Sequence, residues 1–512
     1  MDQYSALFLV FLSITVVAQY FRRLWRARNS PPSPPYYPLI GNLLSLPLGH
    51  EHLEYEKMSK SLKSDIISLS IPGMNIVVLH SAQAATDLFD KRSAIYSDRT
   101  NFTMVENKKL FGWSDFIVFE RYGDRLRRHR RMLNIWLNRS AVKSFHQASE
   151  HQAHLLLQRL LKSCHEFTSS EQIHHELYRT AATGILNMAY GYPVESSDDP
   201  FVERIKQILA DLAKCAVPTN FLANVFPILA HLPDWFPGTS WKQFAREGRV
   251  KKEATMSESY QWTKDRVQNG TAGPSIIHSM LQHYTNQGGI TDQAESDMKQ
   301  EGITMFGAGT DTMAGCLQVF ALAMVMFPEA QAKAQKEIDS VIGTDRLPNI
   351  SDQHDLVYVR NLVQEVLRWQ PIVSLAVPHT CSKDDVYRNY HISKGTLVFG
   401  NLWAMTRDES VYPDPETFNP DRFLDPAVPP APAFGWGRRK CPGSYYAEDF
   451  LFVCMASILA TFKFSRVKDK NGIDIMPSTE PAAKATLYHP KPFACVLTYR
   501  SEKHEALVKI CV

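Results

Sequence analysis

The stretch that most constrains this chain is Phe434 to Gly443, FGWGRRKCPG, in which one cysteine, Cys441, follows a basic turn rich in glycine. Cys441 has no CxxC partner and no nearby histidine, so a structural zinc site is poorly supported. Such a turn can present one thiolate to one metal. Its glycines let the backbone approach a flat ligand, and neighbouring cations and amides favour the thiolate. The alternative is a buried free cysteine in a loop.

A second constraint is a predicted helix from Asp297 to Met326, which ends just before Pro328. Its middle reads FGAGTDT over residues 306–312. Each of the two glycines costs about 1 kcal/mol relative to alanine inside a helix. Close passage over a flat cofactor would explain the glycines, and the acid Asp311 beside the alcohol Thr312 would serve proton delivery. The alternative is a helix kink in which the hydroxyl bonds back to a carbonyl.

An ExxR pattern at Glu365–Arg368 lies between that helix and the cysteine turn. The pattern alone is a weak signal, because a second copy occurs at Glu176–Arg179, which we interpret as a surface i,i+3 pair. Position in the chain separates the two copies.

Together these motifs resemble the cytochrome P450 superfamily over essentially the whole chain. Phe434, Gly437, Arg439, Cys441 and Gly443 match the haem–thiolate signature FxxGxRxCxG. The pair Asp311–Thr312 is similar to the AGxDT motif of the family, and Arg422 matches the arginine that joins the ExxR residues in a buried triad. The chain is most similar to fungal microsomal members of the O-methylsterigmatocystin oxidoreductase-like group, and its WAMTRDESVYPDP segment, residues 403–415, also matches the fungal branch.

The resemblance implies a mainly α cytochrome P450 fold, with a large helical domain and a small β-rich subdomain. It implies haem b with Cys441 as the axial thiolate, and Asp311 and Thr312 as the catalytic pair that supplies protons. The remaining cofactor-binding residues implied by the family are Arg130, His379, Arg439, Phe434 and Gly443. Leu126 stands where the family has a tryptophan, which removes one hydrogen bond worth about 1 kcal/mol to the haem.

The amino terminus predicts a membrane anchor. Tyr4 to Phe21 is an apolar run of 18 residues, nearly long enough for a bilayer core of about 30 Å. Four arginines follow it within residues 22–28, which predicts that this side stays cytoplasmic. A cleaved signal peptide, the alternative, would carry its positive charge before the run. We expect an uncleaved single-pass anchor in the endoplasmic reticulum membrane with the catalytic domain in the cytoplasm.

We divide the chain into an anchor with its basic stop, residues 1–30, a proline-rich hinge, residues 31–50, and a catalytic domain, residues 51–512. Strands are predicted at Ile66–Ser70 and Ile76–Leu79 about the turn Pro72-Gly73. An extended apolar run is predicted at Pro371–His379, and an apolar helix at Ala447–Phe464. By resemblance, the aromatic-rich segments 97–118 and 201–248 lie over the haem and over the substrate entrance.

The formal charge of +3 is too balanced for a nucleic-acid-binding protein, and the eight cysteines lack paired spacing, which fits a reducing compartment. The resemblance implies hydroxylation of a hydrophobic small molecule with O2, in fungal secondary metabolism such as terpenoid or polyketide biosynthesis. Electrons would come from NADPH through a separate NADPH-cytochrome P450 reductase. The alternatives are a haem–thiolate isomerase or dehydratase that needs no O2, and a non-catalytic haem-binding membrane protein.

Overall fold

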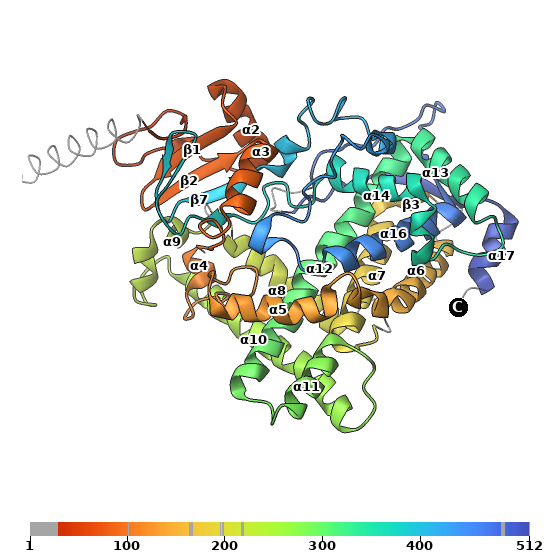
Figure 1. The fold of residues 1–512 in the computed structure, drawn as a ribbon, viewed down its shortest axis with the longest axis horizontal. Coiled ribbons are helices and arrows are strands. Elements are labelled where there is room, and N and C mark those ends of the chain that lie inside the picture. Colours follow the sequence, from red (N-terminus) through yellow and green to blue (C-terminus); the bar gives the residue numbers. More distant parts are fainter. Residues whose placement is uncertain are drawn as a thin grey trace, which may run out of the picture.

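The computed structural model describes residues 29–100, 102–162, 167–194, 196, 199–216, 220–482 and 487–510. The predicted membrane anchor lies outside this range. The described chain is mainly helical with small sheets, as expected (Figure 1). Its longer helices are α2 (Glu51–Leu62), α5 (Asp124–Leu137), α6 (His146–Leu161), α7 (Ser170–Tyr190), α8 (Pro200–Ala216), α10 (Ser240–Gln268), α11 (Ile276–Asn286), α12 (Asp292–Met326), α13 (Pro328–Val341), α14 (Val357–Trp369), α16 (Ser444–Thr461) and α17 (Glu502–Ile510).

The short elements connect and cap this helical body. The short helices are α3 (Ala82–Ala85), α4 (Thr103–Glu106), α9 (Leu222–Val225) and α15 (Leu402–Met405), with a π-helical turn at Thr86–Lys91. The strands are β1 (Ile66–Ile71), β2 (Met74–Leu79), β3 (Phe167–Ser169), β4 (His379–Thr380), β5 (Asp385–Tyr387), β6 (Tyr390–Ile392), β7 (Leu397–Gly400), β8 (Phe462–Arg466) and β9 (Ala494–Tyr499).

The largest sheet has the order β1-β2-β7-β4 and joins distant parts of the chain. β1 and β2 form the predicted antiparallel hairpin, and Gly73 takes φ 78° in its turn, a conformation that favours glycine. β7 then pairs parallel with β2 and antiparallel with β4, where His379 lies opposite Val398. The sheet thus fixes the position of His379, about 300 residues after the first hairpin in the sequence.

α12 is the central helix of the body, as Figure 1 shows. It is 35 residues long and begins earlier than predicted, because the Thr291 side chain caps it by accepting a hydrogen bond from the Ala294 amide. Both glycines of the FGAGTDT segment lie within the continuous helix. Among the described residues, α12 alone is long and apolar enough to cross a membrane, but most of that apolar stretch is buried in the protein core. It is therefore a core helix.

Two of the predicted segments differ from the structure. The helix predicted for Ala447–Phe464 begins at Ser444 and ends at Thr461, and the chain then continues as β8, because Phe462 to Arg466 pair with β9. The run Pro371–His379 is not extended throughout. It turns at residues 374–375, and Ala376 has φ 53°, so only His379 belongs to a strand.

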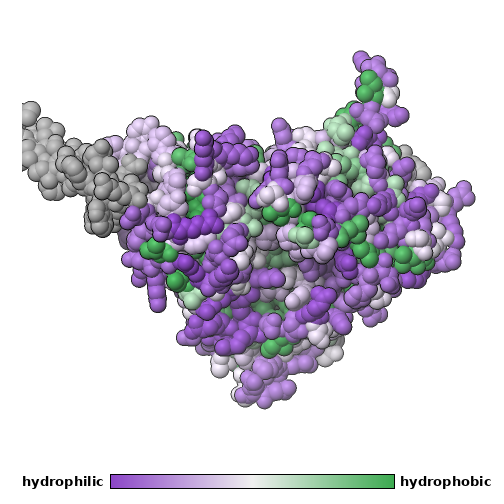
Figure 2. Space-filling model, turned by 45° about the horizontal axis from the view of Figure 1, so that its top comes forward, coloured by the Kyte–Doolittle hydropathy of each residue, from purple (hydrophilic) through white to green (hydrophobic). Residues whose placement is uncertain are grey.

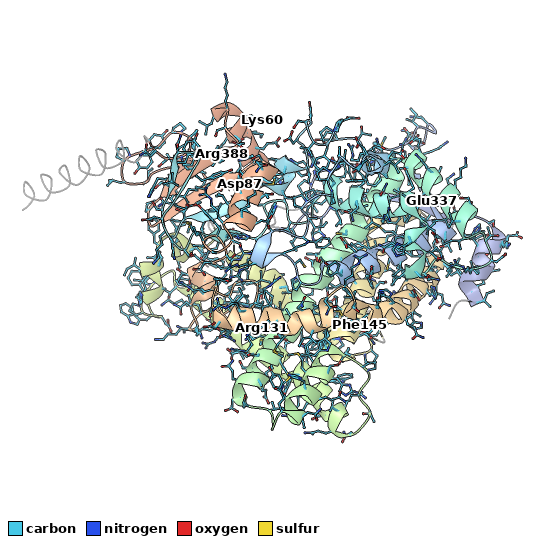
Figure 3. The ribbon with its side chains drawn as sticks, viewed as in Figure 1. Lys60, Asp87, Arg131, Phe145, Glu337 and Arg388 are labelled. Carbon is cyan, nitrogen blue, oxygen red and sulfur yellow. The ribbon has the colours of Figure 1, made fainter. Side chains whose placement is uncertain are left out.

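The surface is mainly polar. Figure 2 shows hydrophilic residues over most of one face, with hydrophobic residues in separate small groups. Figure 3 shows side chains covering the outside of the helices, among them Arg131 on α5. The core is one large hydrophobic cluster among the helices, with two smaller clusters about the sheet.

Candidate haem-thiolate site

The turn before Cys441 is held by a close backbone approach that requires glycine. Gly437 has φ 53°, and a Cβ atom placed there would lie 2.1 Å from the carbonyl oxygen of Phe89. The Gly437 amide also donates a hydrogen bond to the Asp90 carboxylate. The turn is therefore seated against the π-helical segment that contains Phe89 and Asp90, a contact that the sequence motif alone does not reveal.

Cys441 lies at the junction between this turn and α16. Its amide donates to the carbonyl of Phe434 at 2.8 Å. The Arg130 guanidinium, on α5, donates to the carbonyl of the preceding residue, Lys440, at 2.6 Å. Gly443 is the N-cap residue of α16, so the positive end of the helix dipole lies two residues beyond the sulfur. These contacts bring together four of the predicted cofactor-binding residues, namely Phe434, Arg130, Cys441 and Gly443.

The thiol of Cys441 is accessible to solvent although protein atoms surround it densely, which describes a residue on the wall of an internal hollow. Burial raises the pKa of this thiol, while the Gly443 amide, Arg130 and Lys440 lower it. The cations and the amide act in the predicted direction, but burial outweighs them. The favourable direction of the cations and the amide matches the expectation, and a metal ion deprotonates a thiol that coordinates it.

A cluster of positive charge lies next to the cysteine turn, in which Arg99 is buried and Arg130 and Arg439 are half-buried. Arg130, Arg439 and Arg99 have no carboxylate within 4 Å in the part of the chain that the structure describes. Burial lowers the pKa of Arg439 to about 10, with the positive charge of Arg130 adding to this shift. Burial, followed by the charge of Arg439, lowers the pKa of Arg99 as well. The charges of Asp98 and Glu120 act on Arg439 in the opposite direction from farther away, but no carboxylate is in ion-pair contact, so these guanidinium groups fit an anionic ligand.

Arg439 and Arg99 are oriented by backbone carbonyls. Arg439 donates to the carbonyls of Ser97 at 2.8 Å and of Ile117 at 3.4 Å. Arg99 donates to the carbonyl of Val377 at 2.9 Å. Sequence reasoning missed Arg99, because one arginine in an irregular segment carries no pattern. Its exposed fraction of 5 % sets it apart only once the fold is known.

His379 joins the same cluster from β4. It is buried, its ring stacks on Phe89 at 4.1 Å between centroids, and its Nδ1 lies 2.5 Å from the carbonyl oxygen of Tyr96. Since that carbonyl only accepts, Nδ1 carries the proton. Burial lowers the pKa of His379 strongly, and the charges of Arg99 and Arg439 contribute. An anionic carboxylate beside the ring would act in the opposite direction and favour the protonated form.

On α12, the residues 307–312 are accessible apart from the buried Thr310, whereas the helix is buried along residues 313–325. The Thr312 hydroxyl donates to the Ala308 carbonyl at 2.7 Å, the bond that the alternative interpretation of this segment expected. The helix nevertheless continues through it. Asp311 is partly exposed and faces away from the core, with His489 Nε2 3.5 Å from its carboxylate.

Glu365, Arg368 and Arg422 form one buried ion cluster. Arg368 binds both carboxylate oxygens of Glu365, at 2.7 and 2.8 Å, and Arg422 Nε lies 3.1 Å from Oε1. Backbone carbonyls of residues 406–417 accept the remaining guanidinium protons. The cluster therefore ties α14 to the segment that leads into the cysteine turn. The other ExxR copy differs: Glu176 pairs with Arg159 of α6 at 2.7 Å.

Leu126, at the position of the family tryptophan, lies on α5 and is 1 % exposed. It packs in the main hydrophobic core and offers no donor. The guanidinium groups of Arg99, Arg130 and Arg439 are nearby donors that would meet the haem propionates in place of the missing tryptophan.

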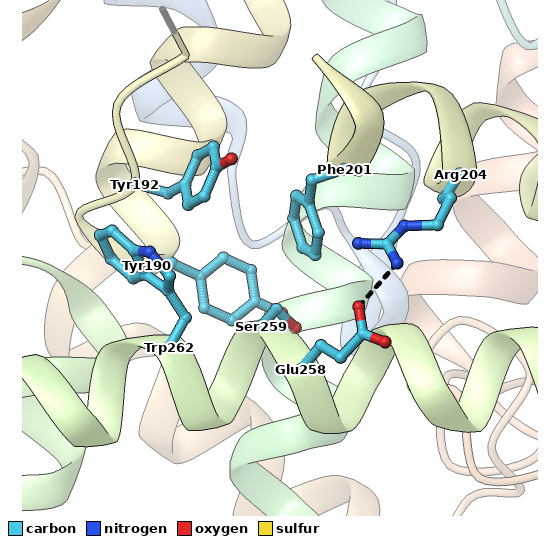
Figure 4. A pocket seen from close by; sticks show the side chains of 7 residues that line it. All are labelled: Tyr190, Tyr192, Phe201, Arg204, Glu258, Ser259 and Trp262. Atoms are coloured by element: carbon cyan, nitrogen blue, oxygen red, sulfur yellow. Dashed lines mark ion pairs between the residues drawn. The ribbon is translucent and has the colours of Figure 1, made fainter.

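One further cavity lies apart from these motifs (Figure 4). It has a volume of about 190 Å³ and opens between the end of α7, α8 and α10. Its walls are aromatic, with the ion pair Arg204–Glu258 at 2.8 Å on one side. The residues that line it are Tyr190, Tyr192, Phe201, Arg204, Glu258, Ser259 and Trp262. None of them belongs to the cysteine turn, the FGAGTDT segment or the ion cluster.

Comparison with known proteins agrees with this geometry. The family model "Cytochrome P450" matches residues 31–495. The chain is 37 % identical over 487 residues to cytochrome P450 monooxygenase 98 of Postia placenta, covering 93 % of this chain and 92 % of that protein. It is 35 % identical over 509 residues to a cytochrome P450 monooxygenase of Armillaria gallica, covering 98 % of each. It is also 35 % identical over 492 residues to cytochrome P450 monooxygenase claR of Ampulloclitocybe clavipes, covering 94 % and 89 %.

This chain belongs to the cytochrome P450 family and is a monooxygenase. The family implies a haem–thiolate cofactor, and the residues present fit it: one accessible thiol, and guanidinium groups without carboxylate partners beside it to meet the two propionates. When bound through Cys441, the haem supplies oxygen activation, with the thiolate pushing electron density to favour O–O cleavage. In the roles that the family resemblance implies, the cysteine turn would hold the thiol, the guanidinium groups would meet the propionates, and Asp311 and Thr312 would supply protons.

Proposed function

We propose that this monooxygenase hydroxylates a hydrophobic small molecule of fungal secondary metabolism, such as a terpenoid or polyketide intermediate. The observation that carries the proposal is the apolar wall beside the accessible part of α12. A Cβ atom on Gly307 would lie 2.9 Å from Leu209 of α8 and 3.7 Å from Phe116. On Gly309 it would lie 2.8 Å from Ile185 of α7. These side chains fill the space beside both glycines, so the glycines allow close packing of α12, and Leu209, Phe116 and Ile185 support the proposal as apolar residues next to its accessible part.

The electron donor in this proposal is NADPH, through a separate NADPH-cytochrome P450 reductase. Cationic side chains on α5 and on the cysteine turn support it, because they would attract an acidic partner. The exposed ones are Arg127, Arg131, Arg438 and Lys440. The hydrogen bond from Arg130 to the Lys440 carbonyl holds α5 against the cysteine turn, next to Cys441.

The proposed location is the cytoplasmic face of the endoplasmic reticulum membrane. Exposed apolar side chains support it: Leu222 is 69 % exposed, Ile228 73 % and Trp235 80 %, all between α8 and α10. Leu44 and Leu48, in the proline-rich hinge, are 70 % and 79 % exposed. Figure 1 places α9 at the same end of the molecule as the β1–β2 hairpin that follows this hinge. Apolar residues so exposed suit an interfacial position.

The test is co-expression in yeast with a reductase, fed with candidate terpenoids and aromatic polyketides. We expect products heavier by one oxygen atom, labelled when the cells receive 18O2, and none from a Cys441→Ser control. Products formed in microsomes without O2 and NADPH would instead establish the isomerase or dehydratase alternative.

The location is tested by deletion of residues 1–30 together with Trp235→Ser. We expect this variant to leave the microsomal pellet and to appear in the soluble fraction. An unchanged soluble pool would contradict the proposed location.

A further inference from the structure

Asp311 leads away from the haem side of α12 towards two histidines from other parts of the chain. His489, in the segment before β9, has Nε2 3.5 Å from the Asp311 carboxylate. The His489 ring stands edge-on to that of His174, near the start of α7, with the centroids 5.9 Å apart. Three titratable side chains from three separate segments therefore form a row that ends at the predicted proton donor.

Both histidines keep one ring nitrogen without a partner. Nδ1 of His489 and Nδ1 of His174 are buried and make no hydrogen bond to the described protein. Buried polar atoms normally have a partner, so two such atoms in one row need an explanation. Each of these two nitrogens can take a bridging water molecule as its partner. A ring that passes a proton must release it at one nitrogen and take up another at the second.

The remaining groups around this row carry mixed charge. Burial lowers the pKa of His174 to about 4, the neighbouring His489 adds to this shift and the negative charge of Asp311 opposes it, so His174 is neutral at neutral pH. Tyr178, one turn along α7, has its pKa raised by burial and by the charges of Asp311 and Glu203. Lys206 of α8 lies 5.3 Å over the Tyr178 ring and is more than half exposed. His174 and His489 are themselves half-buried, so the row reaches the accessible surface.

We propose that His489 and His174 form a proton path from solvent to Asp311. The proton on His489 Nε2 moves to a carboxylate oxygen of Asp311, and His489 takes up a replacement at Nδ1 from the side of His174. The distance of 3.5 Å exceeds that of a direct hydrogen bond, and no hydrogen bond joins the two histidine rings. Small side-chain rotations or bridging water molecules must therefore close both gaps, between Asp311 and His489 and between His489 and His174. In this assignment His489 and His174 are positioning residues that act through Asp311.

The proton path can be tested without an organic substrate, by measuring which product the enzyme forms when it reduces O2. Reduction of O2 by one NADPH and one proton yields hydrogen peroxide and NADP+. Reduction by two NADPH and two protons yields two waters. A slower proton supply favours the first reaction, so the ratio of peroxide released to NADPH consumed reports on the path. The test therefore stands whether or not the proposed substrate class is correct.

The His489→Gln variant, loaded with haem and supplied with reductase and NADPH, is expected to move this ratio towards one peroxide per NADPH. Water formation should fall on the order of tenfold, less than for direct loss of a general acid. His174→Gln should move the ratio in the same direction. His175→Gln is the matched control, because His175 is the next residue on α7 and pairs at 3.6 Å with Glu176, away from this row. A ratio in both variants equal to that of the control would overturn the proposal.

A second readout does not depend on turnover. In the reduced carbon monoxide complex with 15N-labelled histidine, the Nε2 resonance of His489 is expected to shift when Asp311 is replaced by asparagine. It should stay in place when the exposed Asp292, at the start of α12, is replaced in the same way. Equal resonances in both variants would show that His489 does not contact Asp311. If His489→Gln lowered the thermal midpoint and left the peroxide ratio unchanged, the contact between His489 and Asp311 would be purely structural.

Discussion

The Arg368→Ala variant is expected to accumulate as haem-free protein, with the free energy of unfolding lowered by about 3–5 kcal/mol. Glu365 and Arg368 are both 0 % exposed, and removal of the guanidinium leaves a buried carboxylate with only Arg422 as a charged partner. Arg368 also holds the carbonyl of Thr406, at 2.9 Å, in the segment that leads to the cysteine turn. Loss of both contacts should release that segment, and with it the seat of Cys441.

The measurement is the haem content per protein after expression with excess haem precursor, together with the unfolding midpoint in urea. Arg360→Ala is the matched control, since Arg360 lies on the same helix, α14, two turns earlier, and has no carboxylate within 4 Å among the described residues. The control should retain full haem content. Equal haem content in Arg368→Ala and the control would show that the ion cluster does not position the haem seat.

The Asp311→Asn variant is expected to lower NADPH-driven product formation about 100-fold, the lower end of the range for loss of a general acid. Asparagine keeps the size of the side chain but cannot relay a proton. Turnover driven by hydrogen peroxide should fall much less, because peroxide carries both protons that the reaction with O2 must draw from the protein. The two rates are measured on the same preparation with the substrate found in the feeding experiment.

Asp292→Asn serves as control for that variant, because Asp292 lies on the same helix at its exposed first turn. It should leave both rates unchanged. If Asp311→Asn lowered the NADPH-driven and the peroxide-driven rates equally, the carboxylate would hold the helix or the substrate in place and would not deliver protons.

The local elements were predictable where one physical signal dominates. Alternating apolar residues about Pro72-Gly73 define the β1–β2 hairpin, and the apolar run before Pro328 defines α12 up to its last residue. The start of α12 was missed, since Thr291 lies in a polar stretch where only the formed cap marks the helix. The end of α16 was also missed. Phe462 and Phe464 prolong the apolar run in the sequence, but the pairing of this segment with β9, some thirty residues later, makes it a strand.

The sequence motifs predicted the main residues of the site, but not the residues that the fold places around them. Spacing identified Cys441 and the pair Asp311–Thr312, and position in the chain distinguished the two ExxR copies. Spacing gives no information on Arg99, which the fold alone places beside Arg439, or on His489, which lies about 180 residues after Asp311 in the sequence. Such long-range neighbours carry no local pattern, because the contacts that create them depend on the packing of the whole chain.

The central claim is that Cys441 binds haem iron as a thiolate, and the carbon monoxide difference spectrum of the reduced protein tests it most directly. The wild-type protein is expected to show the red-shifted Soret band of thiolate-ligated haem, and Cys441→Ser should lose it. Cys454→Ser, which removes a buried thiol from α16, should keep the band as a matched control. A wild-type spectrum without the thiolate band in freshly reduced protein, or a Cys441→Ser variant that retains it, would contradict the claim.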